Sequence, residues 1–579
     1  GLVIGTKNRG TNRRMSRPRF SPDGERVFFL DDEEPGKPNE VPKTSLVSVR
    51  LDGTDKRAHL RWGKVEEAAV SPDGRWVAFQ ESHEVRVTAL PTEVGKEPVE
   101  VTAEDPALPV ATLSDGGGEW VDWADGGRTV TWIHGPTFRR LALEKAFPVP
   151  EEKKDPAKKE GKKKPPESQA LEILLELPRA RPSALVAYTG ARLVTMRGEE
   201  VVERGTILVE GDRVRSVGPA GAVPPGAQVV DLAGKTVIPG LFDEHAHLHY
   251  STLDLLPRRP WKYHANLAYG VTTTHDPSAS TNEAFAGSEM VEAGLLTGPR
   301  IFSTGYVLYG ADDPERAVVK SLEDARAHVR RMKALGAFTL KSYMQPKREQ
   351  RQMLLQAARE EGVMVVPEGG GDLEMDMTLI LDGHTTIEHA LPVTPLRNDV
   401  VTLFARSATA YTPTLLVAYG GLSGDKWFHQ HYEIWKDEKL LRFVPQGVVD
   451  PIGRIRDVMA TDEDWHHLDV AASARRVQAA GGRVCLGGHG QMQGLGPHWE
   501  IWAFVQGGMR PIEALRVATL SPAQALGLDA DLGSIEAGKL ADFVVLDGNP
   551  LERIENTDSV SLVVKNGVAY RPEDLARGR

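Results

Sequence analysis

The sequence predicts a multidomain protein: a (β/α)8 TIM barrel with a small β-sandwich built from both of its flanks, preceded by all-β, propeller-type blades. Three observations predict this fold class. A turn-and-strand unit recurs before residue 145. Apolar strand-like runs alternate with helix-like segments between residues 239 and 527. Short strands with glycine turns stand on both sides of that region. With 579 residues, the chain is long enough for two or more domains.

The repeated unit is a Ser-Pro-Asp-Gly turn followed by alternating apolar and polar residues. It occurs at residues 20–30 and 70–79, with a weaker copy at 123–132. Proline presets φ and glycine accepts positive φ in such turns, and the alternation is typical of strands. A unit that returns about every 50 residues indicates propeller blades. We therefore expect a partial propeller of about three blades within residues 1–180.

Three blades are too few for a closed ring, which takes about four to eight. Either the sequence is a piece of a longer protein, or a second chain completes the propeller. A small open sheet is the simpler alternative. Near residues 151–166 the chain is mostly Lys, Glu, Pro, Asp, Ala and Gly, which predicts a mobile charged surface loop.

The remaining strands divide between a sandwich and a barrel. Residues 183–238 and 528–571 have the same short-strand pattern, which predicts one composite β-sandwich around the barrel of residues 239–527. In a TIM barrel the active residues lie at the carboxyl ends of the strands. The eight strand candidates end near His247, His275, Tyr306, Lys341, Pro367, Glu388, Thr414 and Gly487.

The first barrel strand carries the clearest candidate site. An apolar run broken by Pro239 and Gly240 leads to His245 and His247. Residues two apart in a strand point to the same side, so both imidazoles can meet one divalent metal. A lone His-x-His pair is equally compatible with hydrogen-bonded core or surface histidines.

The composition narrows the function classes. A net charge of −11 and a pI near 5.9 argue against a nucleic-acid partner. No apolar run approaches the roughly 20 residues of a membrane span. The one cysteine, Cys485, excludes an internal disulfide and a Cys-rich metal site. Residues 1–7 do not resemble a secretory signal, and localisation stays open between cytoplasm and export after processing.

Five motifs occur in a fixed order over about residues 185–571. They are Pro239–His247, Gly270–Thr273 with Asp276, Gly298–Ile301, Ile387–His389 and Gly533–Asp542. These motifs and their order resemble the metal-dependent amidohydrolase superfamily, and its imidazolonepropionase-like and prolidase-like branch in particular. The N-terminal repeats resemble the TolB-like propeller.

This resemblance implies a metal centre. It makes His245 and His247 the ligands after the first strand and His389 the histidine of the sixth. Lys341 stands where that branch often has a lysine carboxylated by CO₂ to bridge two metals. We expect zinc, one ion or two, with another divalent metal as an alternative. A buried lysine is costly unless neutralised or paired, so a salt bridge to a carboxylate is the other explanation for Lys341.

Two positions depart from the family. Glu368 stands where a histidine is expected after the fifth strand, and His489 stands where an aspartate is expected after the eighth. In the family that aspartate binds a metal and accepts the proton of the attacking water. Glu368 and His489 are therefore candidates both for metal binding and for proton transfer. The alternative is a damaged site.

Weaker candidates surround the centre. Tyr343, shortly after Lys341, and Tyr411, at the end of the seventh strand, are predicted substrate contacts, although ordinary packing explains either. Residues 415–470 form a long aromatic connection, which predicts a lid, a substrate wall or a plain insertion. Glu500, near the start of a helix, is explained by the helix dipole.

Two functions remain open. The first is a metal-dependent hydrolase that cleaves an amide bond of a small peptide or cyclic amide with a metal-activated water. The second is a catalytically impaired barrel that acts with the propeller as a binding scaffold. The expected partners are a small-molecule or peptide substrate, with homo-oligomerisation or a second chain completing the propeller.

Overall fold

A computed structural model describes residues 17–33, 43–147 and 164–576, except for residues 64, 92, 94, 96, 103–106, 249–255, 310–316, 344, 346 and 457. Most of the predicted charged loop near residues 151–166 lies outside these ranges. The chain divides into two compact units. The first contains the N-terminal part up to Glu176 and the segment Tyr306–Gly336, and the second contains the rest.

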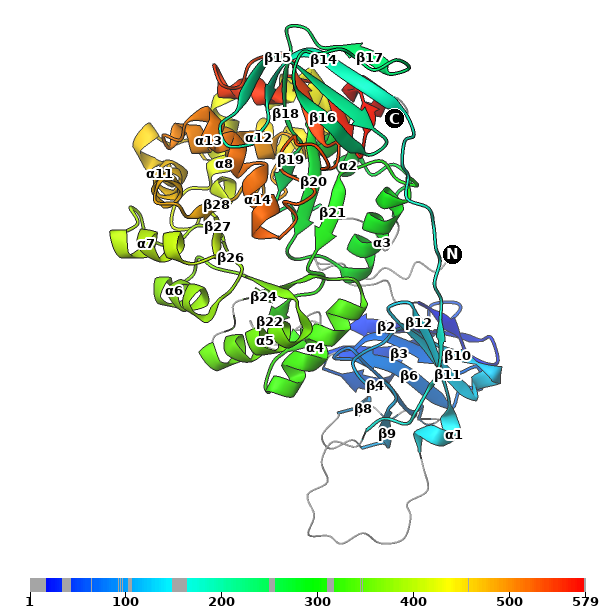
Figure 1. Ribbon diagram of the computed structural model, residues 1–579. Coiled ribbons are helices and arrows are strands. Elements are labelled where there is room, and N and C mark those ends of the chain that lie inside the picture. Colours follow the sequence, from blue (N-terminus) through cyan, green and yellow to red (C-terminus); the bar gives the residue numbers. More distant parts are fainter. Residues whose placement is uncertain are drawn as a thin grey trace. The chain divides into compact units, whose positions relative to one another are not determined.

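The first unit contains three mainly antiparallel sheets, drawn in blue and cyan in Figure 1. Each sheet corresponds to one copy of the sequence repeat, and no closed propeller ring is found among the described residues. The first sheet is β1 (Arg19–Phe20), β2 (Arg26–Asp32), β3 (Thr44–Arg50), β4 (Arg57–Trp62) and β8 (Val99–Glu100). The second is β5 (Val65–Val70), β6 (Trp76–Glu81), β7 (Glu84–Ala89) and β9 (Val110–Thr112), and the third is β10 (Glu119–Ala124), β11 (Thr129–His134), β12 (Thr137–Ala142) and β13 (Gln169–Glu172).

The repeated turns have the geometry that their residues predict. In the first copy, Ser21 Oγ donates a hydrogen bond to Asp23 at 2.5 Å, and Gly24 has a φ of +72°. In the second, Ser71 bonds to Asp73 and Gly74 has a φ of +69°. The third copy lacks serine and proline and forms a 3-10 turn at Asp125–Gly127 instead. The copy with the weaker sequence match is thus also the copy with a different turn.

A helical segment from the barrel region of the sequence packs with these sheets. It contains β22 (Leu308–Tyr309), β23 (Ala317–Val318) and α4 (Leu322–Ala334). The ring of Tyr306 lies 6.1 Å from that of His83, and a Cβ at Gly135 would lie 3.0 Å from the Ala334 carbonyl oxygen. The N-terminal sheets therefore share a compact unit with a segment that begins at Tyr306, 130 residues after Glu176.

The two flanks of the barrel region join in one eight-stranded sheet in the second unit. Its inner face packs around Tyr188, Ile207, Val237 and Phe543, which are at most 2% exposed. The predicted composite sandwich is thus a single sheet with its own core. The strands are β14 (Leu185–Val194), β15 (Val201–Glu210), β16 (Arg213–Pro219), β17 (Gln228–Asp231), β18 (Thr236–Pro239), β29 (Phe543–Leu546), β30 (Val560–Lys565) and β31 (Val568–Tyr570).

Ten strands are described in the barrel region of the sequence. Two of them, β22 and β23, belong to the first unit, and every pairing described among the other eight is parallel. β19 pairs with β20 and β20 with β21, β24 pairs with β25, and β26 to β28 pair in order. A parallel bridge between Glu368 and Glu388 links β25 to β26, and the Glu244 amide donates to the Leu486 carbonyl at 3.0 Å, which joins the last strand to the first. These neighbours follow the chain order of a (β/α)8 barrel, with β21 and β24 in different sheets. The strands are β19 (Leu241–Asp243), β20 (Val271–Asp276), β21 (Arg300–Ser303), β24 (Thr339–Tyr343), β25 (Met364–Pro367), β26 (Thr386–Glu388), β27 (Ala410–Thr412) and β28 (Arg483–Val484).

Helices separate most of these strands, as Figure 1 shows in green to orange. The long connection of residues 415–470 is itself helical and packs through aromatic rings, with Phe428 stacked on Trp499 at 4.9 Å. Its helices are α8 (Gly424–His431), α9 (Glu438–Phe443) and α10 (Gln446–Gly453). The others are α2 (Trp261–Ala268), α3 (Thr281–Glu292), α5 (Arg348–Glu361), α6 (Leu373–Asp382), α7 (Asn398–Arg406), α11 (His466–Ala479), α12 (Gly496–Gln506), α13 (Pro511–Val517), α14 (Leu520–Ala525) and the terminal α15 (Pro572–Ala576).

Gly240 is required where the first barrel strand begins. A Cβ at this position would lie 2.1 Å from Thr272 Oγ1, far inside van der Waals contact. Only glycine lets the chain pass this close to β20. Pro239 ends β18, so the Pro-Gly step separates the sandwich strand from β19 and sets where the histidines that follow are placed.

A buried ion pair stabilises the junction between barrel and sandwich strands. Arg300 donates to Asp542 at 2.7 Å and to Thr273 Oγ1 at 3.0 Å, and the Arg300 and Asp542 side chains are 8% and 5% exposed. Arg300→Met leaves Asp542 buried without its partner, and we expect a loss of about 3–5 kcal/mol in unfolding free energy. Urea unfolding measures it. Arg510→Met breaks the exposed pair with Glu199 and should cost at most about 1 kcal/mol; equal effects would contradict the prediction.

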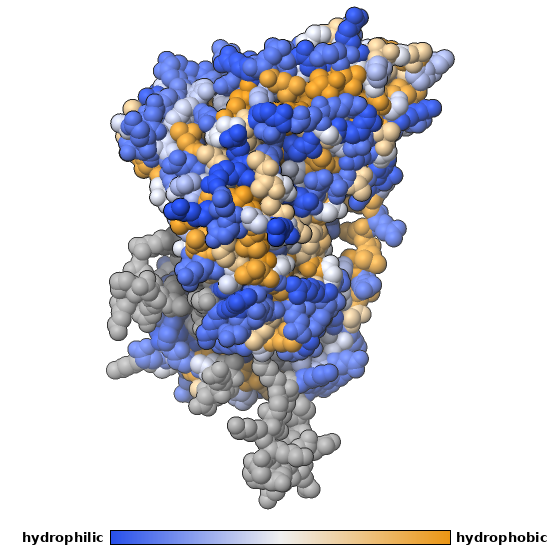
Figure 2. Space-filling model, turned by 60° about the vertical axis from the view of Figure 1, so that its left-hand side comes forward, coloured by the Kyte–Doolittle hydropathy of each residue, from blue (hydrophilic) through white to orange (hydrophobic). Residues whose placement is uncertain are grey.

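The surface is that of a charged protein. Figure 2 shows hydrophilic side chains over much of one face, interrupted by smaller apolar patches. Among the described residues, no helix is both long and apolar enough to cross a membrane.

Candidate active site and metal centre

Four histidines gather at the carboxyl ends of the barrel strands. His245 and His247 follow β19, which ends at Asp243, so both lie just past the strand rather than within it. His389 follows β26 and His489 follows β28. The ring of His245 lies 5.0 Å from that of His247, 4.7 Å from that of His389 and 4.9 Å from that of His489. The structure therefore brings together histidines that are up to 244 residues apart in the sequence.

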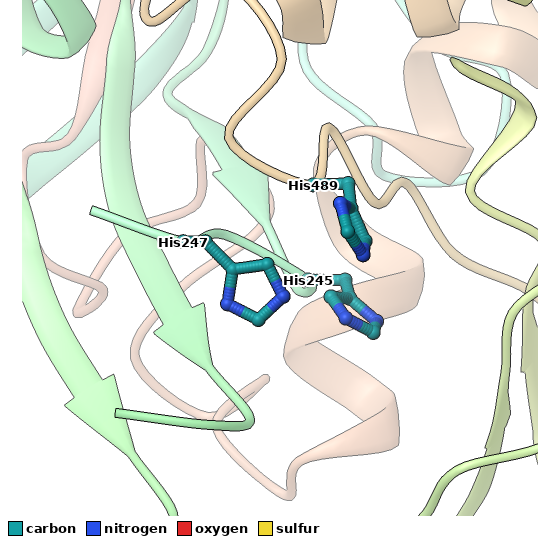
Figure 3. A group of neighbouring side chains, drawn as sticks. All are labelled: His245, His247 and His489. Carbon is teal, nitrogen blue, oxygen red and sulfur yellow. The ribbon is translucent and has the colours of Figure 1, made fainter. Parts of the chain in front are cut away.

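Three of these histidines form a possible metal site. The ligand nitrogens of His245, His247 and His489 all lie within 4.8 Å of one another, and Figure 3 shows their three rings close together. His245 Nδ1 lies 2.6 Å from Glu388 Oε2, and His247 Nδ1 lies 3.1 Å from Asp276 Oδ1. A carboxylate on Nδ1 selects the tautomer whose Nε2 has a free lone pair for a metal. Asp276 thus prepares His247 as a ligand. Glu388, whose pKa burial raises to about 7, does the same for His245 in its ionised form.

Burial favours the neutral form of three of the four histidines, His245, His389 and His489. Desolvation, and then the neighbouring charges of His389 and Lys341, hold the pKa of His245 well below its usual range. Desolvation likewise lowers the pKa of His389, and with the charge of His247 it lowers that of His489 to about 2. Neutral imidazole is the form that binds metals. The donor set, the burial and the carboxylates on Nδ1 all fit a divalent metal such as zinc.

Lys341 and Glu368 form an ion pair beside the histidines. Lys341 Nζ lies 2.7 Å from Glu368 Oε2, and His389 Nε2 lies 3.0 Å from Glu368 Oε1. Burial raises the pKa of the Glu368 carboxyl, but the Lys341 charge and the contact with His389 outweigh it and hold that pKa well below its usual range. Glu368 is therefore an ionised carboxylate at the centre. Lys341 forms a salt bridge with it, which is the alternative to carboxylation that the sequence left open.

Several residues of the centre have strained backbones. His389, Thr414 and His489 have φ values of +70°, +45° and +56°, which non-glycine residues rarely adopt. Each such position costs on the order of 1–3 kcal/mol and is found mostly at functional sites. The Thr414 conformation brings its hydroxyl to 2.9 Å from His389 Nδ1, so this strain orients one of the four imidazoles.

The predicted tyrosines have different surroundings. Tyr411 is 1% exposed, its ring packs 5.2 Å from that of Phe404, and its hydroxyl accepts a hydrogen bond from the Leu391 amide. This packing places Tyr411 in the hydrophobic core and gives no support to a substrate contact. Tyr343 lies near Tyr419: burial and then Glu368 raise the pKa of Tyr419, and Tyr343 adds a smaller effect.

Sequence reasoning missed four contributors to the centre: Asp276 and Glu388 as partners of histidines, Thr414 and Tyr419. Asp276 and Glu388 belong to the amidohydrolase motifs and stand at strand ends, so their positions were a usable signal. The sequence gives no signal for Tyr419 beyond the aromatic composition of residues 415–470. The dipole explanation of Glu500 is wrong, because this carboxylate is fully buried and accepts hydrogen bonds from the Leu415 and Leu416 amides at 2.8 and 3.1 Å.

Residues 236–569 match the family model described as Amidohydrolase family. The chain belongs to this family. An imidazolonepropionase of Symbiobacterium thermophilum is 26% identical over 419 residues, which cover 63% of this chain and 91% of the relative. Adenine deaminase 3 of Rhizobium meliloti is 24% identical over 400 residues, covering 66% of this chain and 58% of the relative.

Solved structures show the same fold. The putative prolidase from Bifidobacterium longum has 25% identity and a TM-score of 0.53, covering 69% of this chain and 98% of that one. A Xaa-Pro dipeptidase with bound methionine has 22% identity and a TM-score of 0.53, covering 67% of this chain and 100% of that one. Family membership implies a TIM barrel and a hydrolase acting on carbon–nitrogen bonds, in a family that is typically metal-dependent. The family match begins at residue 236 and leaves out the N-terminal sheets.

Proposed function

We propose that this protein is a metal-dependent hydrolase that cleaves an amide bond of a small peptide or cyclic amide. The observation that carries the proposal is the group of histidines gathered beside one ionised carboxylate, Glu368, at the carboxyl ends of the strands. The names of the relatives, imidazolonepropionase and Xaa-Pro dipeptidase, favour small substrates.

His245, His247 and His489 are the proposed protein ligands of a zinc ion, with His389 and Glu368 next to them. A second ion would require Lys341 to be carboxylated and so to exchange its ammonium charge for a carbamate. Zinc at such a site polarises a carbonyl group and lowers the pKa of water. A different divalent metal with the same ligands would provide the same chemistry.

Glu368 is the proposed proton acceptor. As a water molecule adds to the substrate carbonyl carbon, its proton passes to Glu368, which returns it to the leaving nitrogen as the carbon–nitrogen bond breaks. His489 is the weaker candidate for this step, because its ring is one of the three proposed metal ligands and Glu368 is not. Lys341 keeps Glu368 ionised before the reaction, and both side chains are at most 5% exposed, so bulk water has little access to them.

Metal analysis and an amide panel test the proposal together. We expect the purified protein to contain close to one or two zinc ions per chain and to hydrolyse at least one dipeptide or cyclic amide. Removing the metal with a chelator should abolish hydrolysis, and adding zinc back should restore it. A metal content near zero after metal-replete purification, with no hydrolysis, would instead favour the binding scaffold.

A further inference from the structure

Tyr419 contacts two residues of the centre at once. Its ring stacks on that of His389, with centroids 4.6 Å apart and planes 19° apart. Its hydroxyl donates a hydrogen bond to Glu368 Oε1 at 3.1 Å. The side chain comes from the segment after the 3-10 helix η2 (Leu415–Val417) and is 37% exposed. Tyr419 thus reaches the buried carboxylate from the open side of the cluster.

The hydroxyl completes the set of contacts around Glu368. Lys341 holds Oε2, while His389 and Tyr419 both contact Oε1. A carboxylate with partners on both oxygens has little freedom to rotate. Proton transfer depends on such restraint, because acceptor and donor must lie within hydrogen-bond reach in one orientation.

The loop after β25 is shaped to admit the Tyr419 ring. Gly370 has a φ of +91°, and a Cβ at this position would lie 2.2 Å from Tyr419 Cδ2. The Asp376 carboxylate accepts hydrogen bonds from the Gly370 amide at 3.1 and 3.2 Å. A side chain at position 370 would therefore displace the tyrosine from Glu368.

A buried carboxylate anchors the segment that carries Tyr419. Glu500 in α12 is 0% exposed and accepts the amide hydrogens of Leu415 and Leu416. Burial raises the pKa of Glu500 well above its usual range, and the two amide hydrogen bonds, which partly offset that rise, hold η2. The same segment places Thr414 against His389 and Tyr419 against Glu368, so one anchor orients two contacts of the centre.

We propose that Tyr419 is a positioning residue that fixes the orientation of Glu368 through its hydroxyl. The inference rests on the proposed hydrolase function for its kinetic readout, whereas its spectroscopic readout requires no substrate. The contribution of the ring is packing on His389, and the contribution of the hydroxyl is the bond to Glu368. A phenylalanine at position 419 separates the two.

The test uses the full chain with Co²⁺ in place of zinc, because the visible absorption of Co²⁺ reports on the groups around the metal. Tyr419→Phe should shift these bands and lower kcat by about 10-fold, the low end of the effect of an outer partner of a metal site. We expect little change in KM and in the thermal midpoint, since the ring remains. Tyr419→Leu should show the same loss and also a lower midpoint.

The matched control is Tyr269→Phe. Tyr269 is a buried barrel tyrosine whose hydroxyl makes no hydrogen bond within the described residues, so removing it should leave the Co²⁺ bands and kcat unchanged. A Tyr419→Phe variant with the parent's spectrum and the parent's kcat would overturn the inference. If the parent hydrolyses no substrate, the proposed function fails, and the spectrum alone decides whether Tyr419 positions Glu368.

Discussion

Glu368→Gln is expected to lower kcat by roughly 10²–10⁴-fold, the usual contribution of a general base. The amide has nearly the same shape but cannot accept the proton of the attacking water. His245, His247 and His489 remain in place, so the zinc content should stay close to that of the parent. Single-turnover kinetics on an amide substrate, with metal analysis of the same preparation, measure both effects.

The substitution also removes the partner of Lys341, whose side chain is 1% exposed. An unpaired buried ammonium destabilises a fold by about 3–5 kcal/mol. A poorly folded variant would be inactive because it unfolds, and not because it lacks the proton acceptor. The control is the double variant Lys341→Met with Glu368→Gln, which removes both charges and should recover stability without recovering turnover. A stable Glu368→Gln variant with the parent's kcat would exclude Glu368 as the proton acceptor.

The histidines could be predicted from the sequence because strand ends are visible in it. An apolar run that stops at a charged or imidazole-bearing residue marks the carboxyl end of a barrel strand, and these ends meet at one face. His245, His247, Lys341, Glu368, His389 and His489 all follow such runs, and the structure gathers them. Their metal-binding and catalytic roles stay predictions.

Tyr419 and Glu500 could not be predicted in the same way. Tyr419 reaches Glu368 because η2 is held by Glu500, which is 85 residues from Leu415 in the sequence. No periodicity in residues 415–419 indicates such a contact, because a loop conformation depends on distant partners. Glu500 itself has the sequence position of a dipole-stabilised carboxylate, and only its burial distinguishes the two roles.

In the N-terminal part, too, local features could be predicted from the sequence and long-range packing could not. The Ser-Pro-Asp-Gly turns are local, so the repeat predicted three sheets with their hairpins. The packing of α4 with those sheets is not local. Its 13 residues have the charged and apolar pattern of any barrel helix, and the pattern does not tell which surface covers the apolar face. The TolB-like character of these sheets stays a prediction.

His489→Ala is expected to reduce zinc affinity by more than the roughly 10–100-fold that loss of an outer-shell partner costs. The reason is that His489 contributes one of three ligand nitrogens within 4.8 Å of one another. Turnover at limiting zinc should fall together with the zinc affinity. If His489 is a metal ligand and not the proton acceptor, excess zinc should restore part of the turnover. Competition with a chromophoric chelator measures the affinity.

The backbone at position 489 supplies the control for that experiment. With a φ of +56°, alanine there adds strain of about 1–2 kcal/mol that has nothing to do with the metal. Asparagine and aspartate tolerate this conformation better, so His489→Asn removes the imidazole with less strain, and His489→Asp supplies the carboxylate that the family has there. We expect zinc affinity in the order histidine, aspartate, asparagine, with alanine close to asparagine. An asparagine variant that binds zinc as tightly as the parent would show that His489 is not a ligand, and the loss in the alanine variant would then come from the backbone.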